Sequence, residues 1–272
     1  MKRILRGLAL GWLLAGAAAA QPAGGRDWKL VWSDEFDQPG RPDATHWTYE
    51  TGFVRNQELQ WYQAANAWCE NGLLIVEARR ERQANPGYEA GSANWKRARE
   101  FAEYTSASLT TRGIASWRYG RLEMRARIDT RAGLWPAFWT VGVDRPWPAN
   151  GEIDIMEFYR GTLLANLIWA GTPRTASFTR RKPVASFEDP AWPSKFHVWR
   201  MDWDENRILI TVDGEVLNDS DLNQAANPDG RNGFRQPHSI ILNLAIGGSA
   251  GGDPSATKFP ARLEVDYVRV YQ

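Results

Sequence analysis

Alternation of apolar and polar side chains is the main pattern in the chain after Gln21. It is clearest in residues 119–128, YGRLEMRARI, where every second residue from Leu122 to Ile128 is apolar and the residues between are charged. A period of two residues predicts a β-strand, and no long segment has the helical period. Similar runs predict further strands in residues 73–81, 106–113, 134–142, 196–204, 239–248 and 263–272.

The segments between these strands predict turns and loops. Asp213-Gly214 lies between two β-rich runs and suits a two-residue hairpin turn. We expect a short helix at Asp219–Ala226 and long loops at 83–99 and 171–192, which either build a binding site or are ordinary surface insertions. Many strands joined by turns rich in Gly, Pro, Asp and Asn predict an all-β fold of two packed antiparallel sheets. Without an internal repeat or a linker, residues 21–272 are expected to form one domain.

The first 20 residues have the pattern of a secretory signal peptide. A basic start at Lys2, Arg3 and Arg6 precedes an apolar run, and small residues end the segment at Ala20. The alternative is a membrane anchor, but the apolar run is shorter than the ~20 residues that span a bilayer. We therefore expect a secreted or periplasmic protein with no membrane association after cleavage.

Composition further limits the classes of function that the chain could have. The formal net charge of +1 argues against a general nucleic-acid binder, and the single Cys69 excludes an intrachain disulfide. The chain has 15 tryptophans, which suggests surfaces that stack on flat ligands such as sugar rings. Arginine outnumbers lysine, which fits either anionic substrates or genomic base composition. The three histidines have no metal-binding spacing.

The segment 150–159, NGEIDIMEFY, places three carboxylates in an apolar run. Strict alternation would put Glu152 and Asp154 on one face of a strand and Glu157 on the other. A buried carboxylate without a partner is costly. One β-bulge at Ile155-Met156 would bring all three acids to the same face, so we predict such a bulge.

Three acids on one face repel one another, so at least one pKa should rise. Cleavage of a glycosidic bond requires one carboxylate that is ionised and another that keeps its proton. The alternatives are a solvated acidic strand and a Ca²⁺ site. Calcium would more often take ligands from loops, and the apolar neighbours argue against an ordinary charged surface.

These acids and six other segments resemble glycoside hydrolase family 16. The acids have its E-x-D-x-x-E form. The other segments are, in chain order, VWSDEFD (31–37), RNQELQWY (55–62), YGRLEMRARI (119–128), GLWPAFW (133–139), ILNLAIGG (241–248) and FPARLEVDYVRVYQ (259–272). The resemblance implies a concanavalin A-like jelly-roll β-sandwich with a concave substrate cleft, and endo-acting hydrolysis with retention of configuration. It assigns Glu152 as nucleophile, Asp154 as assisting carboxylate and Glu157 as general acid/base.

The form of the acid motif is that of the laminarinase-like branch and of galactan-cleaving relatives. One departure concerns the strand after the acids, where Ile168 replaces a His that laminarinase-like members often have. We expect a secreted endo-glycosidase acting on β-1,3-glucan. The alternatives are hydrolysis of a galactan or another anionic algal polysaccharide, transglycosylation, and sugar binding without catalysis.

Other residues are candidates for substrate binding. Trp135 and Trp139 lie four apart on a predicted strand and share one face, where they either stack on sugars or pack in the core. Asn56 and Glu58 alternate in a segment that resembles sugar-binding positions of the family. The further candidates are Arg121 and Trp169.

The resemblance also bears on metals and partners. Glu35 and Asp266 lie in segments that contribute to a structural calcium site in the family, away from the cleft. No cofactor is expected to be required. We expect a monomer whose partner is its polysaccharide substrate.

Overall fold

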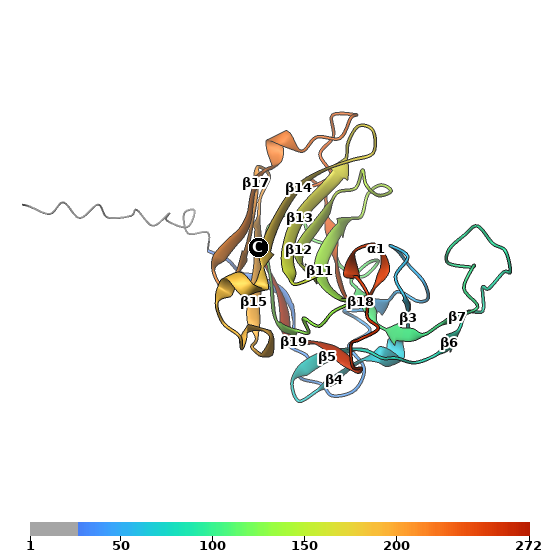
Figure 1. Ribbon diagram of the computed structural model, residues 1–272. Coiled ribbons are helices and arrows are strands. Elements are labelled where there is room, and N and C mark those ends of the chain that lie inside the picture. The colour runs from blue at the N-terminus through green and yellow to red at the C-terminus, as the bar shows by residue number, and fades with distance from the viewer. Residues whose placement is uncertain (1–26) are drawn as a thin grey trace, which may run out of the picture.

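Two antiparallel sheets face each other in the computed structural model, which describes residues 27–272 (Figure 1). The signal peptide predicted for residues 1–20 lies outside this range. Apolar side chains from both sheets meet in one large core cluster, which includes Met124 of one sheet and Phe138 of the other. This arrangement confirms the predicted all-β sandwich.

The eight-stranded sheet has the strand order β17-β16-β15-β10-β19-β5-β4, with β1 also paired to β19. Its strands are β1 (Leu30–Asp34), β4 (Ala67–Glu70), β5 (Leu73–Ala78), β10 (Gly120–Ile128), β15 (His197–Trp203), β16 (Arg207–Val212), β17 (Glu215–Asp221) and β19 (Ala261–Tyr271). In β10 the apolar positions are buried and the charged positions are half-buried, as the alternation predicts.

The seven-stranded sheet has the order β14-β13-β12-β11-β18-β9-β2. Its strands are β2 (Thr48–Tyr49), β9 (Ser108–Thr110), β11 (Leu134–Gly142), β12 (Glu152–Tyr159), β13 (Thr162–Ala170), β14 (Thr175–Pro183) and β18 (His238–Ile246). Strands β11 and β18 are buried on both faces. One face of β11 packs in the core, and the other lines a cavity, so this sheet carries the candidate site.

Two small two-stranded sheets and several short helical elements lie outside the two large sheets. Strand β3 (Gln60–Tyr62) pairs in parallel with β8 (Tyr104–Ser106), and β6 (Gln83–Ala84) pairs with β7 (Phe101–Ala102). The helical elements are α1 (Gly248–Gly251) and 3₁₀ turns at Ala64–Asn66, Val184–Phe187, Trp192–Ser194 and Leu222–Gln224. Within residues 27–272 no helix is long and apolar enough to cross a membrane.

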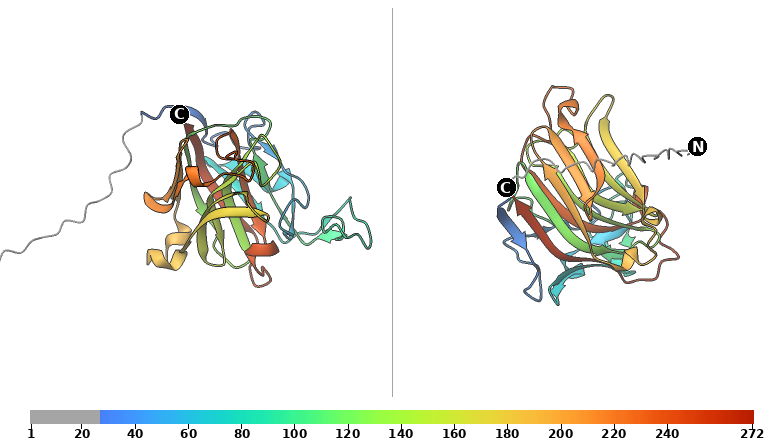
Figure 2. Two further views of the ribbon diagram at one scale, coloured as in Figure 1. Left: turned by 90° about the horizontal axis from the view of Figure 1, so that it is seen from above. Right: turned by 90° about the vertical axis from the view of Figure 1, so that its left-hand side faces the viewer.

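Several local predictions can be compared with these elements. The hairpin turn is confirmed, because Asp213 and Gly214 both have positive φ, 50° and 83°, as a type I′ turn requires. The predicted loop 83–99 begins in β6, and Figures 1 and 2 show it as an arm that projects from the sandwich.

Two predictions of irregular or helical structure are wrong. The predicted loop 171–192 contains the nine-residue strand β14. It is a polar edge strand that is exposed along much of its length, so it lacks the apolar alternation that would identify it. The predicted helix at 219–226 is instead the end of β17 followed by a single 3₁₀ turn.

Candidate active site

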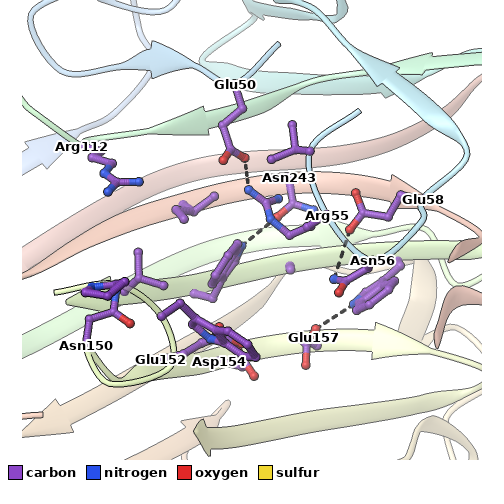
Figure 3. A pocket seen from close by; sticks show the side chains of 18 of the residues that line it. Glu50, Arg55, Asn56, Glu58, Arg112, Asn150, Glu152, Asp154, Glu157 and Asn243 are labelled. Carbon is purple, nitrogen blue, oxygen red and sulfur yellow. Dashed lines mark hydrogen bonds and ion pairs between the residues drawn. The ribbon is translucent and has the colours of Figure 1, made fainter. Parts of the chain in front are cut away.

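A cavity of about 420 Å³ lies over the seven-stranded sheet. Strand β11 contributes alternate residues from Trp135 to Val141, and β18 contributes Ile241 and Asn243. Figure 3 shows the three acids Glu152, Asp154 and Glu157 along one wall, and Glu50, Arg55 and Glu58 along the other. All the acids of the predicted triplet therefore face one space.

A β-bulge turns the acids to the same side. In the pairing of β12 with β13, Asp154 and Glu157 pair with residues 166 and 164, so Ile155 and Met156 together oppose Ala165. Ile155 and Met156 are both fully buried in the core. The bulge predicted at this position is confirmed, and its physical reason is that both apolar side chains gain burial while all three acids keep the cavity face.

A glycine positions the start of the acid strand. Gly151 has a φ of +74°, a backbone conformation that residues with a side chain rarely adopt. A Cβ at this position would lie 2.9 Å from the carbonyl carbon of Gly233. The backbone immediately before Glu152 is therefore held close against the loop that contains Gly233. A side chain at position 151 would force one of these two backbone segments to shift.

Glu157 accepts two hydrogen bonds and is half-buried. The Trp135 Nε1–H donates to Oε1 at 2.7 Å, and the Asn166 Nδ2–H donates to Oε2 at 2.8 Å. Burial raises the pKa of Glu157 to about 7, with the charge of Glu152 adding to the increase and the N–H donors opposing it. This carboxyl can hold a proton near neutral pH, as a general acid must.

Glu152 has a different set of neighbours. The Trp147 Nε1–H donates to its Oε2 at 2.7 Å. Burial raises the pKa of Glu152, whereas the Trp147 donor, the Arg55 charge and a hydrogen bond with Asp154 lower it. A cation and two hydrogen bonds therefore favour the ionised form of this carboxyl.

Asp154 lies between the two glutamates and is 2% exposed. The Asn166 Nδ2–H donates to its Oδ2 at 2.9 Å. Burial, with the charges of Glu157 and Glu152, raises the pKa of Asp154 well above its usual range. A protonated Asp154 can donate to a neighbouring carboxylate, so the triplet can hold one ionised and one protonated glutamate at the same time.

Four of the expected substrate-binding residues line the cavity: Asn56, Glu58, Trp135 and Trp139. The alternation of Asn56 and Glu58 had implied a strand, but the structure does not place these residues on one. They lie in the turn before β3, where Asn56 has a φ of 55°, and the Asn56 amide donates to Glu58 at 3.3 Å. Trp139 is 9% exposed, and Arg55 lies over its ring at 4.9 Å.

Two expected substrate-binding residues lie elsewhere. Trp169 faces the core, where it packs against Phe178 and Phe234. Arg121 is on the eight-stranded sheet and forms a two-point ion pair with Asp202 at 2.7 and 2.9 Å. Both assignments are wrong, because strand alternation alone does not tell which sheet face meets the core and which meets the cavity.

The expected calcium ligands are bound to arginines instead. Glu35 accepts from Arg269 at 3.0 and 2.8 Å, and Asp266 is paired with Arg125. In residues 27–272 no group of three or more His, Cys, Asp or Glu side chains could hold a metal ion. As placed, Glu35 and Asp266 do not fit a calcium ion. That no cofactor is required stays a prediction.

Three residues of the site were not identified from the sequence. Asn166 is a single amide in an apolar run, and that contrast could have identified it. Trp147 lies on the loop before the acids, and its half-exposed ring had no pattern to mark it. Arg55 comes from a turn far from the acids in sequence, so only the tertiary structure brings it to Trp139.

Comparison with known proteins agrees with this geometry. Residues 56–269 match the family model of glycosyl hydrolases family 16. The chain is 41% identical to a β-glucanase from Rhodothermus marinus over 266 residues, which cover 90% of this chain and 85% of that protein.

Solved structures are also similar. The laminarinase catalytic domain from Thermotoga maritima has a TM-score of 0.75 and 33% identity, covering 91% of this chain and 99% of that one. A structure from a study of endo-acting O-glycanases, which prominent members of the human gut microbiota express to initiate mucin breakdown, has a TM-score of 0.82 and 34% identity. It covers 90% of this chain and 91% of that one.

Proposed function

This chain belongs to glycosyl hydrolase family 16, and from that premise we propose that it is an endo-acting hydrolase of β-glucan that retains the configuration of the anomeric carbon. The observation that carries this proposal is the unequal environment of Glu152 and Glu157. Burial raises the pKa of both carboxyls, that of Glu157 to about 7, but the Arg55 charge opposes the increase at Glu152 and the Glu152 charge adds to the increase at Glu157. Retaining hydrolysis needs this difference.

In the first step, the Glu152 carboxylate attacks the anomeric carbon and the glycosidic C–O bond breaks. Glu157 gives its proton to the departing oxygen, and a covalent glycosyl-enzyme forms. In the second step, Glu157, now ionised, takes a proton from water, and the water oxygen displaces Glu152 from the sugar. Asp154 assists by hydrogen bonding, and Asn166 holds Asp154 and Glu157 in fixed relation.

We propose β-1,3-glucan of the laminarin type as the substrate. The relatives named as a β-glucanase and a laminarinase support this choice, as does the exposed indole ring of Trp147 in the cavity lining. The arginines that had indicated an anionic substrate, Arg121, Arg125 and Arg127, are ion-paired on the eight-stranded sheet. They cannot contact a chain bound over the other sheet.

A second candidate substrate is a galactose-containing or sulfated glycan. The structure from the O-glycanase study has the higher TM-score of the two reported above, and a keratan-sulfate endo-1,4-β-galactosidase from Sphingobacterium multivorum is 27% identical over 252 residues. Arg112 lines the cavity and is exposed, so it could meet an acidic substituent. The Arg112 side chain is the structural feature that favours this second candidate substrate.

The experiment is a substrate panel with purified protein. It compares laminarin, mixed-linkage β-glucan, agarose, porphyran, carrageenan, keratan sulfate and mucin, with NMR of the anomeric protons during early hydrolysis. We expect short oligosaccharides from laminarin, with the β-anomer forming first. Faster cleavage of a sulfated galactan or of mucin would overturn the substrate choice, and first release of the α-anomer would overturn the retaining mechanism. Products longer than the donor would indicate transglycosylation.

A further inference from the structure

Arg55 has an unusual position in the cavity wall. It begins the turn that contains Asn56 and Glu58, and its side chain is 21% exposed. The guanidinium is ion-paired with Glu50 through Nη2, and its Cζ lies 4.9 Å from the centre of the Trp139 ring. The other terminal nitrogen, Nη1, is buried and has no hydrogen-bond partner. A buried donor of a charged group without a partner is costly, so the position of Arg55 needs an explanation.

The strand register brings this cation over the strand beside the acids. Trp139 pairs with Asp154, and Val141, two residues further along β11, pairs with Glu152. Because Arg55 lies on the Trp139 ring, its charge lies over the strand next to β12, above the residue that pairs with Asp154. Arg55 and Glu152 line the same cavity, on the two facing walls seen in Figure 3.

The other neighbours of Glu152 do not offer an equivalent charge. On its own strand the charged groups are Asp154 and Glu157, which are both acidic. Its cross-strand partners, Val141 on β11 and Ile168 on β13, are apolar.

The remaining charged groups come from the cavity wall. Glu50 and Glu58 are acidic. Arg145 is ion-paired with Asp229 at 2.8 Å, and Arg112 is exposed to solvent, which screens its charge. Arg55 is ion-paired as Arg145 is, but among the described residues that line this cavity it is the one cation among the main influences on Glu152, whose pKa it lowers.

Arg55 is among the main influences on Glu152 and is not among the main influences on Glu157. Its charge lowers the pKa of Glu152, whereas the largest influences on Glu157, apart from burial, are Trp135, Glu152, Asp154 and Asn166. The Glu50 carboxylate opposes the Arg55 charge, and the half-buried position of Arg55 limits the screening of its field by solvent.

We propose that Arg55 is a positioning residue that makes the two glutamates unequal: its fixed charge keeps Glu152 ionised for attack and leaves the proton to Glu157. This inference rests on the proposed roles of Glu152 and Glu157. It assigns to Arg55 a function in preparing the nucleophile rather than in binding sugar. It also explains why the face of Trp139 is covered by a guanidinium instead of being open to substrate.

The test compares Arg55→Gln, Arg55→Lys and Glu50→Gln by the pH profile of kcat/KM, with circular dichroism as a check of folding. Arg55→Gln should move the acidic limb upward by roughly 0.5 to 1 pH unit. Arg55→Lys keeps the charge and should restore most of this shift. Glu50→Gln removes the opposing carboxylate charge and should move the same limb downward.

A structural role would give a different result. If Arg55 only holds the turn in place, Arg55→Gln and Glu50→Gln should both reduce activity without opposite shifts of the limb. An unmoved acidic limb in folded Arg55→Gln, or shifts in the same direction in both variants, would overturn the proposal. Glu152→Gln distinguishes a failure of the proposed catalytic roles from a failure of the proposal for Arg55. If it stays active, the proposed roles fail; if it is inactive and the limb of Arg55→Gln is unmoved, only the role of Arg55 fails.

Discussion

The indole nitrogen of Trp135 donates a hydrogen bond to Glu157 Oε1 at 2.7 Å. The other catalytic glutamate has a donor of the same kind, since Trp147 donates to Glu152 Oε2 at the same distance. The two donors differ in exposure: Trp135 is 8% exposed and belongs to a buried strand, whereas Trp147 is 54% exposed. The donor to Glu157 is therefore fixed by packing within the sheet, whereas the donor to Glu152 comes from an exposed loop.

Replacement of the nucleophile should abolish most of the activity. Glu152→Gln keeps the shape but removes the charge that attacks the sugar, so we expect turnover to fall at least ~10³-fold, which corresponds to ~4 kcal/mol of barrier. Stability should be retained, because the side chain lines the cavity. The matched control is Glu205→Gln, at an exposed turn after β15, which should have normal activity. Near-normal turnover in folded Glu152→Gln would refute the assignment.

The pH profile should report the proton on Glu157. A raised carboxyl pKa means that the proton is kept to higher pH, so the acid form is present below a pH of about 7 and is lost above it. The alkaline limb of kcat/KM should therefore lie near 7. In Trp135→Phe the donor that lowers this pKa is absent, and the limb should move to higher pH. A limb that stays in place, or moves down, would contradict the role of this hydrogen bond.

The acid role of Glu157 also predicts a dependence on the leaving group. Glu157→Ala should slow the cleavage of glucan much more than the cleavage of an activated aryl glycoside, because the latter needs little protonation of the departing oxygen. The ratio of the two rates is the measurement. Equal losses on both substrates would argue against general acid catalysis by Glu157.

Asn166 should affect turnover more than substrate affinity. Its amide holds both Asp154 and Glu157, so Asn166→Ala should reduce kcat by about tenfold or more with a smaller change in KM. The control is Thr179→Ala, which alters the cross-strand partner of Asn166 on β14 and should leave kcat unchanged. If Asn166→Ala raises KM alone, the residue binds substrate and does not organise the acids.

Trp169 and Trp147 should separate stability from activity. Trp169→Ala empties a core position and should lower the free energy of unfolding by about 3–5 kcal/mol. Trp147→Ala, at an exposed site, should change stability by no more than about 0.5 kcal/mol but should impair catalysis, since Glu152 loses its donor. Denaturant unfolding and steady-state kinetics on both variants are the measurements. If Trp169→Ala instead impaired catalysis and left stability unchanged, Trp169 would have to be assigned to the cleft.

Much of the fold follows from local patterns in the sequence. The alternation in residues 119–128 determined strand β10 and its buried face, because side chains on a strand point to opposite sides. The Asp213-Gly214 pair determined a hairpin turn, since few residues accept two positive φ values in succession. The acid spacing in β12 required a bulge, because the alternative buries Glu157 away from its partners.

The tertiary structure decided what these local patterns leave open. Strand β11 is apolar on both faces, so its sequence does not tell which side holds Trp135 and which side meets the core. The same ambiguity led to the wrong prediction that Trp169 binds substrate, whereas it lies in the core. Arg121 and Arg55 are both ion-paired arginines beside aromatic rings, but one lies on the eight-stranded sheet and the other lies in the cavity. Electrostatic effects depend on distance and solvent exposure, and these are set only when segments far apart in sequence pack together.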